Sequence, residues 1–178
     1  NDSPAIDTSA PWEQIYSVDQ NIGSQSGVVF TFKDSANNQD TATINFTVDN
    51  SLDAAGTLAP SETSSYIYIS GSTVYYSNQM PGTETLTLTV TGASDAVSGL
   101  KYVEFPAILG VSLWQDTASP YTRDYSITST NNQEGACNSI TKDNAGNNTA
   151  TNSLTITRII SQDPPTGISF KTTSVGSS

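Results

Sequence analysis

The chain has 178 residues, of which 35% are hydrophobic, including 8 Tyr and 5 Phe, and this composition predicts a globular protein of one or two domains. Its 6 Lys and Arg against 17 Asp and Glu give a net charge of −11, which would repel a phosphate backbone. Nucleic acid is therefore not an expected partner. No apolar run approaches the roughly 20 residues of a membrane-spanning helix, so we expect no membrane span in this chain.

Apolar residues recur at every second position along most of the chain, which is the pattern of β-strands. Clusters of Gly, Pro, Asn and Asp separate these runs, and Ser70-Gly71-Ser72 is typical of a hairpin turn. No window has the spacing of a long helix, and Asp95 to Gly99 allows one helical turn at most. In chain order, the predicted strands cover residues 15–18, 28–32, 42–48, 66–70, 73–76, 85–91, 100–105, 111–114, 124–128, 136–141 and 154–160.

About seven strands in roughly 100 residues are typical of an immunoglobulin-like antiparallel β-sandwich, so the predicted fold class is all-β. The alternation places Tyr66 and Tyr68 on one face of their strand, where we favour a core-lining role over a contact surface. The core positions predicted from alternation are Leu86, Leu88, Val90, Val103, Phe105, Trp114, Tyr125, Ile127, Leu154 and Ile156.

The chain contains an internal repeat. Lys142-Asp143 follows Lys33-Asp34 by 109 residues, and Asp116-Thr117 and Pro120-Tyr121 follow Asp7-Thr8 and Pro11-Trp12 by the same distance. After the shared turn one residue drops out, so that Thr41 aligns with Thr149 and Phe46 with Leu154. The repeat predicts a partial module over residues 1–54, equivalent to the second half of a complete module over 55–162, with 163–178 as a linker or donated strand.

Within residues 85–158, and by the repeat within 7–50, the sequence resembles the immunoglobulin-like repeats of bacterial and archaeal cell-surface proteins and large adhesins. The resemblance is carried by Thr87 to Val90, Ala93 to Leu100, Pro120-Tyr121 and Asp143 to Asn147. The first copy departs from this pattern, because Ala36-Asn37 replaces Ala145-Gly146. We therefore expect its turn to differ in geometry.

The two turns are also the candidate metal sites. Asp and Asn side chains favour a structural turn by bonding to nearby backbone N–H groups, and they also supply the oxygen ligands that calcium prefers. A purely structural turn is the favoured interpretation, so we expect no cofactor, with calcium as the alternative. The calcium candidates are Asp34, Asn37, Asn38 and Asp40 in the first copy and Asp143, Asn144 and Asn147 in the second, with Asp7, Asp49, Asp53 and Asp163 as a second possible place.

Asn45-Phe46-Thr47 and Asn147-Asn148-Thr149 match the pattern of N-glycosylation acceptors, although such tripeptides also arise by chance in a chain rich in Asn and Thr. The chain has one Cys, few Lys and many Ser, Thr and Asn, which favours a secreted protein at the cell surface.

Catalytic groups are scarce. The chain has no His, so the commonest general base is absent. Cys137 has no His or second Cys to activate it and is expected to be a small buried hydrophobe. We expect a protein that is not an enzyme.

The partial module predicts self-association. Without the strands that precede the equivalent stretch in the complete module, its apolar residues Phe30, Phe32, Phe46 and Val48 would be exposed. The complementing strand would be Thr166 to Val175 of a neighbouring copy, with Ile168 and Phe170 pointing inward, or the missing first half in a longer parent chain. The predicted function is a structural subunit of an extracellular fibre that joins head-to-tail to copies of itself. The alternative is an adhesin or carbohydrate-binding module that recognises host or cell-surface glycans, or a stalk segment of a giant surface protein.

Overall fold

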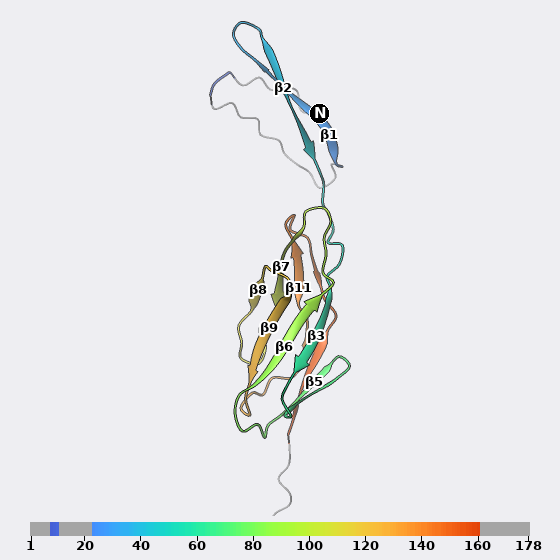
Figure 1. Cartoon of the computed structure of the whole chain (residues 1–178), viewed down its shortest axis with the longest axis vertical. Coiled ribbons are helices and arrows are strands. Elements are labelled where there is room, and N and C mark those ends of the chain that lie inside the picture. Colours follow the sequence, from blue (N-terminus) through green and yellow to red (C-terminus); the bar gives the residue numbers. More distant parts are fainter. Residues whose placement is uncertain (1–7, 11–22, 161–178) are drawn as a thin grey trace, which may run out of the picture. The chain divides into compact units, whose positions relative to one another are not determined.

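The computed structural model describes residues 8–10 and 23–160, which are all-β and contain no helix (Figure 1). This part of the chain accordingly has no helix long and apolar enough to cross a membrane. The chain divides into two compact units, Asn1–Ser51 and Leu52–Ser178. The predicted boundary lay between residues 54 and 55.

The first unit contains one antiparallel hairpin in its described residues, formed by β1 (Gln25–Lys33) and β2 (Gln39–Phe46). The predicted strand at 15–18 lies outside the described residues. The second unit contains β3 (Thr57–Glu62), β4 (Ile67–Ser70), β5 (Thr73–Ser77), β6 (Glu84–Thr91), β7 (Leu100–Phe105), β8 (Trp114–Asp116), β9 (Tyr121–Ile127), β10 (Gly135–Cys137), β11 (Ile140–Asp143), β12 (Asn148–Ala150) and β13 (Leu154–Ile159).

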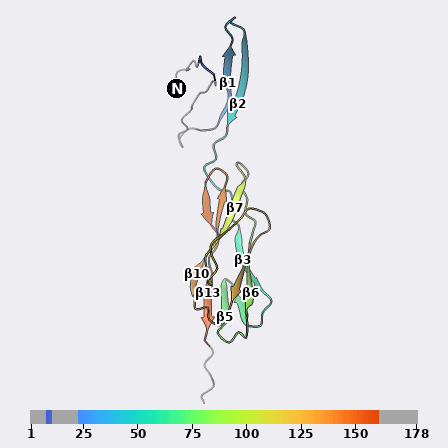
Figure 2. The same cartoon turned by 90° about the vertical axis from the view of Figure 1, so that its left-hand side faces the viewer.

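The second unit is a β-sandwich, which confirms the predicted fold class. Its strands form a three-stranded sheet, β3-β6-β9, and two four-stranded sheets, β12-β11-β7-β8 and β10-β13-β5-β4. Figure 2 shows β3 and β6 on one side of the unit and β10 and β13 on the other. One cluster of buried side chains from all three sheets fills the space between them.

Alternation explains this core. Leu86, Leu88 and Val90 of β6 are buried while the Thr residues between them are not, as period-two geometry requires. Two large tyrosines are also fully buried, because each hydroxyl finds a carbonyl acceptor. Tyr76 Oη donates to Gln133 O at 2.9 Å, and Tyr125 Oη donates to Pro106 O at 2.8 Å.

Nine of the ten predicted core residues are buried, and the prediction for Trp114 is wrong. Its side chain is 48% exposed. It lies on β8, an edge strand of three residues, where the Arg123 guanidinium stacks 5.0 Å from the indole centroid. A cation over an aromatic ring is attractive in this arrangement and holds the ring at the surface.

The core-lining interpretation is also wrong for Tyr68, which is 65% exposed on the edge strand β4. Its ring stacks on that of Tyr75 across the β4–β5 hairpin, with centroids 6.1 Å apart. Ile67, on the opposite face of β4, enters the core instead.

Some predicted strand bounds differ from those observed. β3 was not predicted, because Pro60 lies in it and only Leu58 is buried. As an edge strand beside β6 it tolerates a proline that a central strand would not. The predicted strand 136–141 is two strands, β10 and β11, which pair with different partners, β13 and β7 respectively.

Leu88→Ala should lower the free energy of unfolding of the second unit by about 2–5 kcal/mol, since the lost side chain leaves a cavity in the core. Urea unfolding followed by far-UV circular dichroism measures this change. Thr85→Ala on the same strand is the matched control, because Thr85 is exposed and its loss should cost less than about 0.5 kcal/mol. Equal effects of the two substitutions would contradict the core described above.

Candidate functional site

The β1–β2 hairpin carries an apolar face. Val28 pairs with Ile44 and Phe30 with Ala42, so these residues share one face of the hairpin with Phe32. Phe32 is 55% exposed and Phe46 is 37% exposed, whereas Val28, Phe30 and Val48 are half-buried. Large apolar side chains at this exposure are typical of a surface that associates with another chain segment.

The predicted donor residues Ile168 and Phe170 lie outside the described residues, so their pairing with this hairpin stays a prediction.

The turn after β1 and the turn after β11 share three hydrogen bonds. The Asp34 N–H donates to Asn38 O, and the Asp143 N–H donates to Asn147 O, both at 3.1 Å. In each turn the Asp Oδ1 accepts from the backbone N–H four residues later, at 2.8 Å. The Asn Nδ2 donates to the Asp Oδ2, at 2.7 Å in the first turn and 2.8 Å in the second.

The expected difference between the turns is confined to the replaced position: the Asn37 N–H donates to the Asp34 backbone O at 3.0 Å, whereas the Gly146 N–H donates to Asp143 Oδ1 at 2.6 Å. Asn37 adopts φ 71° where Gly146 adopts φ 101°. Asn is the residue that tolerates the left-handed region best after Gly, so the replacement preserves the turn.

The strand pairing also corrects the alignment of the two copies. Lys33 pairs with Gln39 and Lys142 with Asn148, and Thr31 pairs with Thr41 as Ile140 does with Ala150. The offset of 109 thus continues through β12. The one-residue gap falls after Ala150, where β12 ends and β13 has not yet begun, and not directly after the turn.

Hydrogen bonds set the ionisation of both aspartates. For Asp34, the side-chain hydrogen bond from Asn38 and those from the Asn38 and Ala36 backbone lower the pKa below its usual 3.8, against a smaller effect of desolvation. For Asp143, desolvation is the largest effect and raises the pKa. The combined hydrogen bonds from Asn147, Gly146 and Ala145 outweigh it, so the pKa is lowered overall. Both side chains are hydrogen-bond acceptors in their charged form.

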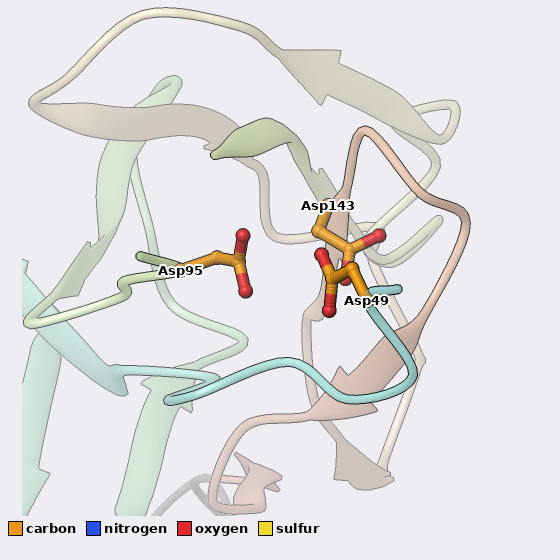
Figure 3. Close-up of side chains that lie close together, drawn as sticks. All are labelled: Asp49, Asp95 and Asp143. Carbon is orange, nitrogen blue, oxygen red and sulfur yellow. The ribbon is translucent and has the colours of Figure 1, made fainter. Parts of the chain in front are cut away.

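Asp143 lies beside a second carboxylate of the same unit, that of Asp95 (Figure 3). One carboxylate oxygen of Asp95 lies within 4.8 Å of one of Asp143. Asp95 Oδ2 accepts hydrogen bonds from the backbone of Ser98 and Gly99, at 2.8 and 2.6 Å, which shapes the turn before β7. Its Oδ1 is buried and accepts no hydrogen bond within the described residues.

Asp49, which Figure 3 also labels, belongs to the first unit, where its Oδ1 accepts a hydrogen bond from the Ser51 backbone at 3.4 Å.

Calcium binding stays a prediction at every predicted place. The turn hydrogen bonds already occupy the oxygens of Asp34 and Asp143, and Asn144 donates its side-chain amide to Ser98 O and Gly99 O. Asp40 Oδ1 accepts from the Thr41 backbone, and Asp53 Oδ2 accepts from Ala96. Calcium needs six to eight oxygens, and Asp95 and Asp143 together are a small part of such a set. Asp7 and Asp163 lie outside the described residues.

The two predicted glycosylation positions differ in their surroundings. Asn45 is exposed on β2, and its Oδ1 accepts a hydrogen bond from the Gly27 backbone at 2.9 Å. Asn147 is half-buried, and the nitrogen to which a glycan would attach donates to Asp143. Of the two, Asn45 has the environment that an attached glycan requires.

The contact surface that the sequence left as an alternative for Tyr66 and Tyr68 coincides with a shallow aromatic pocket at the β4–β5 hairpin. Its volume is about 250 Å³, and Tyr66, Tyr68, Tyr75 and Ile159 are among its lining residues. The density of tyrosine in this stretch was the available signal. Cys137 is buried as predicted, and burial raises the pKa of its thiol, so it is kept protonated and unreactive.

Comparisons with known proteins return little. No protein-family model matches the chain, and no curated protein matches it. The chain is similar to a solved structure from a 1.5-MDa bacterial ice-binding adhesin, at 24% identity and a TM-score of 0.42. The similarity covers 75% of this chain and 41% of that one, so the chain spans less than half the length of that structure. A likeness of this level carries no argument about function.

Asp143→Asn should destabilise the second unit at pH 7 and reduce its sensitivity to acid. The folded-state pKa of Asp143 is lowered, so its contribution is complete above the unfolded value near 3.8 and is lost as pH falls through the folded value. An amide at this position would also present a donor to the Asn147 amide. Thermal unfolding at pH 7 and pH 3 should show a smaller difference for the variant than for the wild type.

Asp34→Asn is the matched control for this experiment, because it changes the equivalent turn in the other unit. It should leave the unfolding transition of the second unit unchanged. An identical pH response of wild type and Asp143→Asn would contradict the role given to the Asp143 carboxylate.

Proposed function

We propose that this chain is a structural, non-enzymatic module of an extracellular surface fibre, joined to its neighbours by β-strand complementation of the first unit. The observation that carries the proposal is the apolar face of the β1–β2 hairpin, with Phe32 and Phe46 exposed. A two-stranded hairpin is marginally stable by itself, so a face of this kind gains stability from an added strand.

The internal repeat supports this reading of the hairpin face. Applying the offset of 109, Val28 corresponds to Cys137 and Phe32 to Thr141, both of which are buried in the complete module. After the one-residue gap, Phe46 corresponds to Leu154 and Val48 to Ile156, which are each 1% exposed. The apolar face of the hairpin thus carries the positions that form a core in the second unit, and among the described residues Phe32 and Phe46 remain exposed there.

The proposed location and the absence of catalysis rest on composition. The chain has one Cys, 6 Lys and Arg, no His and a net charge of −11. A thiol that is buried and held protonated needs no reducing compartment, and a strongly negative chain stays soluble outside a cell.

One observation favours a second candidate function, a glycan-binding module. The pocket at the β4–β5 hairpin is lined by tyrosines, serines and two isoleucines and by no charged side chain. Tyrosine rings with nearby hydroxyl groups suit the apolar faces and hydroxyls of a neutral sugar. Isothermal titration calorimetry with neutral oligosaccharides, on the wild type and on Tyr68→Ala, tests this alternative. A binding heat that is the same for both proteins would rule out the pocket as the binding site.

Phe32→Asp should weaken self-association of the chain, because it places a charge on the face that another strand would cover. Sedimentation velocity over a hundredfold range of concentration measures the effect, and we expect the species larger than a monomer to decrease at least about tenfold. Val29→Asp is the matched control, since Val29 is 58% exposed on the opposite face of the same strand and should change association little.

Deleting residues 164–178 tests the donor. If a neighbour's tail complements the hairpin, the truncated chain should sediment as a monomer at every concentration. Polymers that persist in both the truncated chain and Phe32→Asp would overturn head-to-tail complementation as the proposed mode of assembly.

A further inference from the structure

Resting on the proposed function, we infer which segment complements the hairpin: a first half-module, equivalent in sequence pattern to residues 55–109 of this chain. The complete module shows what such a segment contacts. Residues 55–109 contain β3 to β7, here called the first half, and residues 110–162 contain β8 to β13, here called the second half.

Each sheet of the complete module is closed by pairing between these halves. In the three-stranded sheet, β9 of the second half pairs with β6 of the first. In the two other sheets, β11 pairs antiparallel with β7, and β13 pairs in parallel with β5. Within the second half, the pairs are β10–β13 and β11–β12.

The β1–β2 hairpin is equivalent to β11–β12 by its turn and by its register, so it retains a pair that lies within the second half. The pairs with counterparts of β5 and β7 are the ones that the two-stranded sheet does not contain. Among the described residues, the first unit therefore repeats strands of the second half without the strands of the first half that pair with them in the complete module.

The complete module also fixes the register of the incoming strand. Ile140, Thr141 and Lys142 pair with Glu104, Val103 and Tyr102, and Asp143 pairs with Leu100 after a bulge. Transferred by the offset of 109, the strand of the β7 type lies antiparallel to residues 31–34, with its Val103 counterpart opposite Phe32. The position of Phe32 on the apolar face agrees with this register.

A second contact between the halves supports the choice of partner. Asn152, in the break between β12 and β13, accepts a hydrogen bond from the Leu58 N–H at 2.7 Å and donates to Leu58 O at 3.0 Å. In the first unit the equivalent stretch belongs to β2, which continues without a break to Phe46. The break between β12 and β13 therefore occurs in the copy in which β3 bonds to the second half through Asn152.

One donated strand cannot reproduce these contacts, because strands β3, β5, β6 and β7 all contact the second half. A half-module supplies them together. This distinguishes the inferred partner from the tail of a neighbouring copy, which offers one strand.

The experiment joins a second copy of residues 55–109 to Asn1 of the full chain, which restores the spacing of a complete module. Hydrogen exchange, read on peptides that cover residues 28–33 and 40–48, reports on the hairpin. We expect exchange there to slow about 100-fold or more relative to the unfused chain, since these strands become part of a cooperative core.

Two further fusions make the result specific. In the first, Val103→Asp is placed in the added copy alone, and hairpin protection should be lost because this position faces the core. In the second, Phe32→Thr restores the residue found at Thr141, whose hydroxyl donates to Ala55 O at 2.6 Å in the complete module. This variant removes any clash caused by the larger Phe ring.

The inference is supported if hydrogen exchange in the hairpin slows in a fusion with the unaltered copy, with either Phe32 or Phe32→Thr, and if this protection is lost when the added copy carries Val103→Asp. Exchange as fast in both of those fusions as in the unfused chain would overturn it. Protection in the unfused chain that depends on residues 164–178 would also overturn it, while leaving the proposed fibre function intact. Conversely, the hairpin could be protected in the fusion while Phe32→Asp self-associates as the wild type does. That result would reject self-assembly through the hairpin and leave this inference intact.

Discussion

The structure depends on one constraint, that a β-sheet with an apolar face must pack that face against another sheet. In the second unit this constraint is met by one cluster of buried side chains drawn from three sheets. Each of the three sheets contains strands from both halves of the module, so neither half can bury its own apolar face. Residues far apart in sequence, such as Leu58 and Asn152, are therefore held together directly. Loss of either half removes the other's partner strands.

Local interactions, by contrast, are largely shared by the two copies. The turns at Asp34 and Asp143 close with the same hydrogen bonds, all within five residues. Such a turn needs no contribution from the rest of the module, so it forms in the first unit even though the described hairpin has two strands. The strand register follows from the turn, which explains why β1–β2 and β11–β12 pair alike.

The contrast between local and long-range interactions also explains which features could be predicted from the sequence. The sandwich and nine core positions followed from alternation, which is a local property. Trp114 was misplaced because β8 is too short for alternation to fix its face, and because Arg123, which covers the indole, lies on a strand of another sheet. β3 was missed because Pro60 argues against a strand unless its edge position is known. The alignment gap between the two copies was placed too early because both copies contain Thr-Ala-Thr. The strand pairing of β1–β2 and β11–β12 shows that the gap follows Ala150. In the candidate site, the turn residues and hairpin face were predictable, but the neighbouring Asp95 carboxylate was not, since folding brings it to Asp143.

The two copies differ most where the halves of the module meet. At Thr141 the complete module has a hydroxyl that donates to the Ala55 carbonyl, whereas the equivalent Phe32 has no hydrogen-bonding side-chain atom. Burying a carbonyl without a donor is costly, so a carbonyl placed opposite Phe32 as Ala55 O is placed opposite Thr141 would weaken the pairing. In the inferred pairing, a half-module copied from residues 55–109 lacks this donor at Phe32 and regains it with Phe32→Thr.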